Sequence, residues 1–594
     1  MKRMLGSRSS QALSALVLVL VLALVATACG GNSNDNSQGS NSSTTVDPTG
    51  NETTSPGTES GDETEASYGG AISVGLRAET ANWIPGEAVG TGALMVALSI
   101  YDPLVSLTAD GDFEPFLAES IDHNDDASEW TVTLRDGVLF ADGSPLDAET
   151  LKWNFDTIHH REGSRTLSTL TNAGVLDMEV VDPLTVRYLL DGPNAGFPDV
   201  LRGAVGWPIS RLAYEADPEG YGQNPVGTGP FVMTEWIRDD RIVVKRNENY
   251  WFKAANGDQL PYLDQITFRP IPDENSRTQS LASNDLQMIH SSRGSFIKQI
   301  IDLVEAGPYE YNLHTGNTAA ATYLNVLVPP FDDTRVRQAL AYASNMDAIA
   351  QILGDDGLTE PTFQLFSTDS PWYSPAADAA YPEADGRNLD AAIELLDAYR
   401  NDPNRSDGKA VGAALDPIKY MCPTDPVQVQ MAALYQGLWD DLGVEVKVDT
   451  VDEPTLVSRF VGSADTSPPF VGDYDTSCTY ISGGEGDPFT AIAGAFGPVA
   501  TTPGNITNFT DPRIDDLLED LKSTVDLATR KEIVEKISII VAEEAPIIWA
   551  SKTPTIVAYS NKLHGVKDWR LPSGELGNGT PVGDARFHQV FIAK

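Results

Sequence analysis

One segment in the second half of the chain restricts the possible folds more than any other. It begins with a predicted strand at Ile418–Cys422, continues with a helix at Val427–Leu442 and ends with a second strand at Val444–Thr450. Strands joined through a helix lie parallel in one sheet, because the helix returns the chain to the edge where the first strand began. A further strand is predicted at Asp473–Tyr480. The segment therefore predicts an α/β fold, in which ligands bind at the carboxyl ends of the strands.

A second informative segment lies in the first third of the chain. Apolar and polar residues alternate over Trp130–Leu134, which is the period of a half-buried strand. Gly137 predicts a turn, because glycine adopts positive φ without steric cost, and Val138–Phe140 is the predicted return strand of a hairpin. Asp147 is the predicted N-cap of the helix that follows. That helix would bury Leu151, Phe155 and Ile158.

Charge and motifs exclude several classes of function. The 594 residues carry 85 acidic and 40 basic side chains, a net charge of −45. Nucleic-acid binding depends on basic side chains that neutralise phosphates, so no nucleic-acid partner is expected. The sequence has no Walker loop, no metalloprotease or nucleophile-elbow motif and no Cys/His set with metal-ligand spacing. We therefore expect a binding protein with no metal and no cofactor, and the adjacent His159 and His160 are expected at the surface.

Four segments of the chain carry a family resemblance. They are Leu134–Glu149, Asn224–Phe231, Pro329–Ala343 and Asn508–Leu518. Together they resemble the family 5 extracellular solute-binding proteins, the peptide- and nickel-type binding subunits of ABC importers. The first match is long and ungapped, and the resemblance as a whole spans Tyr68 to Val566. It identifies a family and not a ligand.

The resemblance implies a definite architecture. An α/β, two-lobed periplasmic-binding-protein-like fold of type II (cluster C) is expected, with an extra subdomain inserted in the first lobe. The first lobe is expected at residues 68–315 and 551–594, with the subdomain at about 91–215, and the second lobe at 316–550. The solute would bind between the lobes and be enclosed when they hinge shut.

The first 67 residues are expected to lie outside this body. Residues 1–28 combine a basic start, a long apolar run and small residues before Cys29, which is typical of a lipoprotein signal peptide. Cleavage would leave Cys29 as a lipidated N-terminus on the outer face of the cell membrane, on its periplasmic or cell-wall side. Residues 29–67 are rich in Ser, Thr and Asn and predict a disordered tether. The alternative is an uncleaved membrane anchor.

Candidate ligand contacts in the first lobe follow its first strand, which is predicted to open at Tyr68. Members of the family line their cleft at the exit of this strand, so the resemblance implies ligand contact for Glu79, Asn82 and Trp83. Ordinary core packing is the alternative role of Trp83.

A loop in the second lobe is the most informative segment for specificity. In peptide-binding members a similar loop ends in an acidic residue and proline, and an aspartate four residues before that proline binds the α-amino group of the peptide. Counting back from Pro488, Gly484 occupies that position here and Glu485 follows one residue later. The predicted contacts are Tyr480, Ile481, Ser482, Gly483, Gly484 and Glu485. A solvated loop carboxylate is the alternative role of Glu485.

Two cysteines remain once Cys29 is set aside. Cys422 and Cys478 lie at or near the ends of two predicted strands of the second lobe. An extracytoplasmic location favours disulfides, so we expect these two residues to pair. Two buried thiols are the alternative.

The expected function is that of the substrate-binding subunit of an ABC importer. A monomer would capture a peptide-like solute and deliver it to a membrane permease with separate ATPase subunits. Gly484 argues against a standard clamp for the amino terminus, so an oligosaccharide stacked on Trp83 and Tyr480 is a second possibility. A nickel ligand is less favoured, because no histidines cluster at the predicted cleft. A surface receptor coupled to a sensor kinase is an alternative from another class.

Overall fold

A computed structural model describes residues 66–594 except 81, 88–91, 162–163, 293, 315, 317, 354–357, 359–360, 425, 453–454, 457–458, 460–471, 485, 500–504, 581–584 and 594. All described residues belong to one compact unit, Thr64–Lys594. The expected signal peptide, Cys29 and all but the last two residues of the expected tether lie outside them. Within the described ranges, no helix is both long and apolar enough to cross a membrane.

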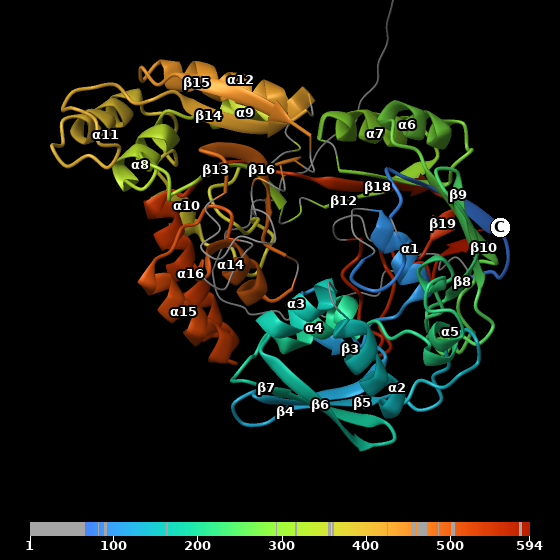
Figure 1. The fold of residues 1–594 in the computed structure, drawn as a ribbon. Helices are drawn as coiled ribbons and strands as arrows, with labels where there is room; N and C mark the ends of the chain where they lie inside the picture. Colours follow the sequence, from blue (N-terminus) through green and yellow to red (C-terminus); the bar gives the residue numbers. More distant parts are fainter. Residues whose placement is uncertain are drawn as a thin grey trace, which may run out of the picture. The chain divides into compact units, whose positions relative to one another are not determined.

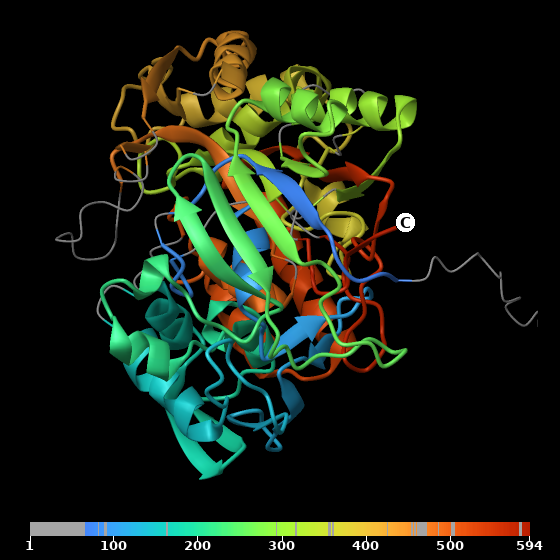
Figure 2. The same cartoon turned by 90° about the vertical axis from the view of Figure 1, so that its right-hand side faces the viewer.

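A seven-stranded mixed sheet holds the start of the described chain (Figure 1). Its order is β12 (Tyr309–His314), β18 (Thr555–Ser560), β11 (Met288–Ser291), β1 (Ala71–Leu76), β10 (Gln265–Pro270), β9 (Arg241–Arg246) and β8 (Phe231–Ile237). The central strand β1 is parallel to β10 and β11, and Figure 2 shows it in blue beside the green strands of the sheet.

Helices cover both faces of this sheet, because side chains of alternate strand residues point to opposite faces. Met288 of β11 packs in the core formed with α1 (Ala93–Ile100). Its neighbour Ile289 packs in a second core with α6 (Glu274–Ala282) and α7 (Gly294–Ala306).

A five-stranded sheet forms the second large layer (Figure 1). Its order is β15 (Val446–Val451), β14 (Ile418–Pro423), β16 (Thr476–Ser482), β13 (Thr318–Leu324) and β17 (Ile547–Lys552). Strands β14 and β15 are parallel and are joined through α12 (Pro426–Asp440), so the predicted strand–helix–strand unit is confirmed. A disulfide links Cys422 of β14 to Cys478 of the adjacent strand β16, with 5.3 Å between the two Cα atoms.

Two layers of helices enclose the five-stranded sheet. One core contains side chains of α8 (Thr334–Tyr342), α9 (Met346–Leu353), α11 (Leu389–Arg400) and α12. The core on the opposite face contains side chains of α10 (Pro375–Ala380), α14 (Pro488–Phe496), α15 (Pro512–Ser523) and α16 (Leu527–Glu544).

A four-stranded antiparallel sheet is inserted between β1 and β8 of the first sheet. Its order is β4 (Ala118–His123), β5 (Glu129–Leu134), β7 (Thr185–Leu190) and β6 (Val175–Asp182). Packed with it are α2 (Ala148–Trp153), the π-helix Asn154–His159, α3 (Arg165–Asn172) and α4 (Phe197–Arg202). The remaining elements are β2 (Val105–Leu107), β3 (Phe113–Pro115), β19 (Leu563–His564), β20 (Phe591–Ile592), α5 (Arg211–Ala216), and the 3₁₀ turns Ala204–Gly206 and Tyr221–Gln223.

The predicted hairpin in this inserted region is wrong in one respect. Strand β5 forms as predicted, and Gly137 has a φ of 76°. Val138–Phe140 does not return along β5, because β4 and β7 already occupy both edges of that strand. Leu139 instead makes an isolated bridge to Pro145. Asp147 caps α2 by accepting a hydrogen bond from the Thr150 amide at 2.8 Å, as predicted.

The chain passes between the two large sheets twice. It leaves β12 of the seven-stranded sheet to enter β13 of the five-stranded sheet, and it returns from β17 to β18. The two crossings lie side by side, since the Thr553 amide donates to the Thr318 carbonyl at 2.7 Å.

Candidate functional site

The segment after β1 is fixed by contacts with the rest of the first sheet. The Glu79 carboxylate, 10% exposed, accepts hydrogen bonds from the Trp236 indole at 2.8 Å and the Asp239 amide at 3.2 Å. Asn82 donates to the Glu87 carboxylate and accepts from its own loop. These bonds connect the segment to β8 and stabilise the conformation of the loop.

Trp83 lies in the core. Its side chain is fully buried and meets Trp236 edge to face, with 5.6 Å between the ring centroids. Its backbone carbonyl accepts from the Tyr101 hydroxyl at 2.8 Å. The indole Nε1 has no hydrogen-bond partner among the described residues. This placement corresponds to core packing, the alternative role that the sequence allowed for Trp83.

The second predicted segment leaves the five-stranded sheet at the end of β16. Ile481 is buried, and Gly483 lies so close to the Leu365 carbonyl that a Cβ atom would approach that oxygen to 2.7 Å. Gly484 has a φ of 70°, in the region that favours glycine. Glu485 and the side chains of Tyr480 and Ser482 lie outside the part of the chain that the structure describes.

A cavity of about 240 Å³ lies between the inserted region, α14 and the loop that follows the first predicted segment. Its wall contains Gly86, four residues beyond Asn82, and Thr490 of α14, five residues beyond Glu485. The inserted region supplies the remaining wall through α3, α4 and the turn after α4. The lining residues are Gly86, Arg165, Thr166, Thr169, Asp199, Val200, Gly203, Ala204, Val205 and Thr490. None of the individually predicted residues is part of its lining.

The cavity offers charges of both signs and hydroxyl groups. Arg165 is exposed and has no ion-pair partner within the described residues. The Asp199 carboxylate accepts from Arg202 Nε at 2.7 Å and is 14% exposed. Such a lining suits a small polar solute with positive and negative groups.

A buried histidine supports this wall. His159 Nδ1 lies 3.1 Å from the hydroxyl of Thr166, a lining residue. His159 is only 2% exposed, so its expected place at the surface was wrong. The π-helical turn directs its ring inward, and burial lowers the pKa of the ring from 6.5 to about 4. We therefore treat His159 as neutral.

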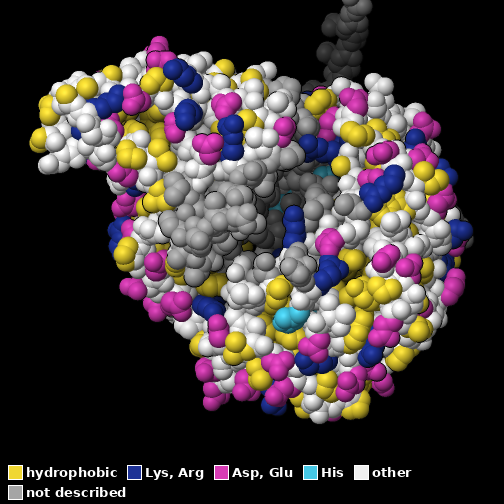
Figure 3. Space-filling view, viewed as in Figure 1, with side chains coloured by type: hydrophobic (Ala, Val, Ile, Leu, Met, Phe, Trp, Pro, Cys, Tyr) yellow, Lys and Arg dark blue, Asp and Glu magenta, His cyan; other side chains and the backbone are white. Residues whose placement is uncertain are grey.

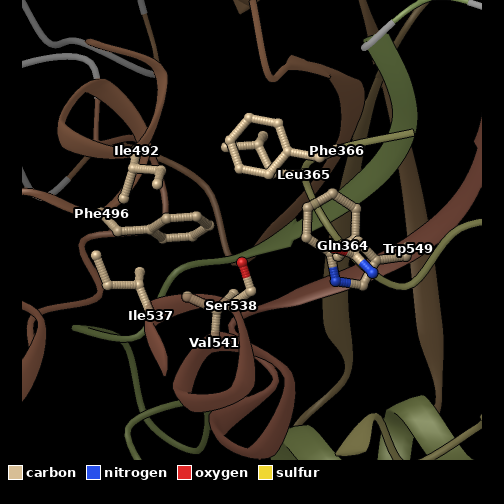
Figure 4. A pocket seen from close by; sticks show the side chains of 9 residues that line it. All are labelled: Gln364, Leu365, Phe366, Ile492, Phe496, Ile537, Ser538, Val541 and Trp549. Atoms are coloured by element: carbon tan, nitrogen blue, oxygen red, sulfur yellow. The ribbon is translucent and has the colours of Figure 1, made fainter. Parts of the chain in front are cut away.

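A second cavity is too small to hold a solute (Figure 4). Its volume is about 10 Å³, close to the minimum for one water molecule. Apolar side chains of α14, α16 and β17 surround it, including Phe496, Val541 and Trp549. It is a packing defect of the core between the five-stranded sheet and α14–α16.

The exposed surface adds two observations. Figure 3 shows a hollow near the middle of one face, with Lys or Arg side chains in and beside it. Within the described ranges, no group of three His, Cys, Asp or Glu side chains is placed to hold a metal ion.

The sequence of this chain matches known proteins over most of its length. Residues 112–502 match the model of the bacterial extracellular solute-binding proteins, family 5 middle region. The glutathione-binding protein GsiB of Salmonella paratyphi A is 31% identical over 312 residues, which cover 50% of this chain and 59% of that protein. GsiB of Escherichia coli O1:K1 / APEC is 26% identical over 502 residues, which cover 82% of this chain and 90% of that protein.

Solved structures show the same fold. The ABC transporter substrate-binding protein CtaP of Listeria monocytogenes superposes with a TM-score of 0.71 at 21% identity, covering 89% of this chain and all of CtaP. The oligopeptide-binding protein AppA of Bacillus subtilis, solved with a nonapeptide, gives 0.69 at 20% identity and covers 89% of this chain and all of AppA. These likenesses confirm the expected fold class. The chain belongs to family 5 of the bacterial extracellular solute-binding proteins, a family of extracytoplasmic binding proteins and not of enzymes.

Proposed function

We propose that this chain is the substrate-binding subunit of an ABC importer, which captures a small peptide-like solute and delivers it to a membrane permease with separate ATPase subunits. The observation that carries the proposal is the cavity of about 240 Å³. Its walls come from the inserted region and from α14. The inserted region packs around the four-stranded sheet, whereas α14 packs against the five-stranded sheet. A solute bound there contacts both sides and so favours the arrangement in which they meet.

The proposed lobes follow the sheets. The seven-stranded sheet takes its strands from residues 71–314 and 555–560, and the five-stranded sheet from 318–552. This supports a first lobe at 68–315 and 551–594 with its inserted subdomain, and a second lobe at 316–550. The two adjacent crossings would then be the hinge, because they are short segments between rigid sheets.

The class of solute is inferred from size and charge. A cavity of about 240 Å³ lies below the range of ~300–1,000 Å³ that is common for drug-sized ligands, which favours a solute of a few residues. Arg165 and Asp199 offer partners for the carboxylate and ammonium groups of such a solute. The GsiB relatives are named for glutathione, itself a tripeptide. The oligosaccharide alternative loses support, because the fully buried ring of Trp83 has no free face for a sugar.

The loop after β16 remains a proposed contact region. Residues 480–485 precede α14 in the sequence, and Thr490 of α14 lines the cavity, so Glu485 stays our candidate for an acidic contact in the second lobe. In the first lobe, the proposal places the contact at Gly86 rather than at Glu79, since Glu79 is already engaged by Trp236 and Asp239.

Membrane attachment through Cys29 is part of the proposal. Lipid on this cysteine and a flexible tether at residues 29–67 would keep the binding unit near its permease. Labelled palmitate is expected to be incorporated into the protein and not into the Cys29→Ser variant. An unlabelled protein that stays in the membrane fraction would favour the uncleaved anchor.

Calorimetric titration of the compact unit tests the function. The titrants are di- and tripeptides including glutathione, the same peptides with blocked termini, oligosaccharides and nickel complexes. We expect binding of short free peptides, weakened at least tenfold by Arg165→Gln. The matched control is Arg187→Gln on β7, whose side chain lies 3.9 Å from Glu129 and outside the cavity. Binding of oligosaccharides alone would refute a peptide-like solute.

A further inference from the structure

The inserted subdomain makes direct contact with the helices of the second lobe. The Ala195 amide donates to the Lys522 carbonyl, at the end of α15, over 2.9 Å. The Lys522 ammonium lies 3.6 Å from the Asp191 carboxylate. These residues are distant in sequence, and their contact brings the segment before α4 against the ends of α14 and α15.

Two aspartates and two glycines form the centre of this contact. A Cβ atom placed on Gly196, in the inserted subdomain, would overlap the carboxylate of Asp487 in the second lobe. A Cβ atom placed on Gly486, beside Asp487, would overlap the carboxylate of Asp199 in the subdomain. Each side therefore presents one carboxylate to a glycine of the other side, and the arrangement is reciprocal.

These two positions require glycine because they lack space for a side chain, and not because of their backbone conformation. Gly196 has φ and ψ of −86° and 3°, which an alanine also adopts. Gly486 is not among the described residues with positive φ. An alanine at either position is therefore compatible with the local fold and incompatible only with the approach of the opposite carboxylate.

Each carboxylate is held by an arginine of its own side. Asp487 forms an ion pair with Arg530 of α16, both 5% exposed, and caps α14 through the Phe489 amide at 2.9 Å. Asp199 is paired with Arg202 one turn further along α4. The two halves of the contact are thus preformed, so that meeting requires no rearrangement within either half.

We propose that the Ala195–Lys522 hydrogen bond and the Lys522–Asp191 ion pair form a latch that holds the two lobes closed over the cavity even without solute, at a contact that Gly196 and Gly486 make possible. The cavity lies directly beside it, since Asp199 and Thr490 of α14 line the cavity wall. Gly196 and Gly486 are the positioning residues, because a Cβ atom at either position would overlap the carboxylate of the opposite side. The role of the latch in solute capture rests on the proposed function, whereas its existence does not.

Amide hydrogen exchange of the full-length chain tests the latch without any solute. The reporter is the Ala195 amide, whose acceptor is the Lys522 carbonyl of the opposite lobe. We expect this amide to be protected in the unmodified protein and to exchange at least tenfold faster in Gly486→Ala. The matched control is Gly494→Ala in α14, where a Cβ atom meets nothing within 4 Å. Both substitutions lie far from Ala195 in sequence, so its intrinsic exchange rate stays the same.

A double-mutant comparison shows whether the overlap with Asp199 is the cause. In an Asp199→Ala background the extra methyl group of Gly486→Ala has no carboxylate to meet, so it should no longer accelerate exchange at Ala195. Acceleration that persists in this background would overturn the proposal. So would an unprotected Ala195 amide in the unmodified protein, or equal protection in Gly486→Ala and Gly494→Ala. A failure of all solutes to bind would instead refute the proposed function and leave the exchange result valid.

Discussion

At the scale of single residues, Asp102 is an acid in an unusual, buried environment. Asp102 is 2% exposed and accepts hydrogen bonds from the Trp251 indole at 2.9 Å and the Tyr250 hydroxyl at 3.3 Å. Burial raises its pKa from 3.8 to about 7, although both hydrogen bonds and Arg586 act in the opposite direction. The folded protein therefore holds a proton on Asp102 that the unfolded chain releases at much lower pH.

Asp102 should give the stability of the protein a pH dependence of known sign. Because its pKa is higher in the folded state, its contribution is most favourable below pH 4 and is lost as the pH rises towards 7. The contribution of Asp102 to the free energy of unfolding changes over this range by an amount on the order of 4 kcal/mol. We expect Asp102→Asn to become more stable relative to the unmodified protein over this range, as measured by urea unfolding at several pH values. A constant difference between the two proteins would contradict the assignment.

Trp83 gives a second prediction at this scale. If the ring only packs in the core, Trp83→Phe should change solute affinity less than twofold, whereas Trp83→Ala should cost roughly 3–5 kcal/mol of unfolding free energy. Titration of the Trp83→Phe variant with a peptide that the unmodified protein binds distinguishes core packing from solute contact. A large loss of affinity in a variant with unchanged stability would restore Trp83 as a solute contact.

At the scale of elements, local sequence patterns correctly predicted the features that depend only on residues close together in the sequence. The alternation over β5 and the cap at Asp147 are short-range properties, and both are confirmed. The return strand at Val138–Phe140 failed because the partners of β5 are set by β4 and β7, and β7 is distant in sequence. The cavity lining was missed for the same reason. Thr166, Gly203 and Thr490 carry no motif, and only the packing of distant helices brings them together.

The cap of α2 is expected to contribute measurably to the unfolding free energy. Asp147→Ala removes the acceptor of the Thr150 amide and should lower the unfolding free energy by about 1 kcal/mol. Asp147→Ser keeps a capping oxygen and should retain most of the stability. Urea unfolding of the two variants checks this, and equal losses in both would show that the cap is not the stabilising feature.

At the scale of the whole molecule, charge is the dominant property. A net charge of −45 generates self-repulsion that opposes compact folding and that salt screens. We expect the melting temperature to rise by several degrees between ~10 mM and ~500 mM sodium chloride. Sucrose at equal osmolality serves as the uncharged control. A melting temperature that is insensitive to salt would show that ion pairs within the fold already offset the excess of acidic groups.

The position of β18 has a consequence for the order in which the protein is made. This strand lies between β11 and β12, and β12 has no other neighbour in the sheet. During synthesis and export the five-stranded sheet has all its strands once residue 552 has emerged. The seven-stranded sheet, although it contains the first strand of the chain, gains β18 only at residues 555–560. The sheet that contains β1 is therefore completed after the five-stranded sheet, and a ribosome or translocation channel that still holds residues 555–560 leaves β12 without its neighbour.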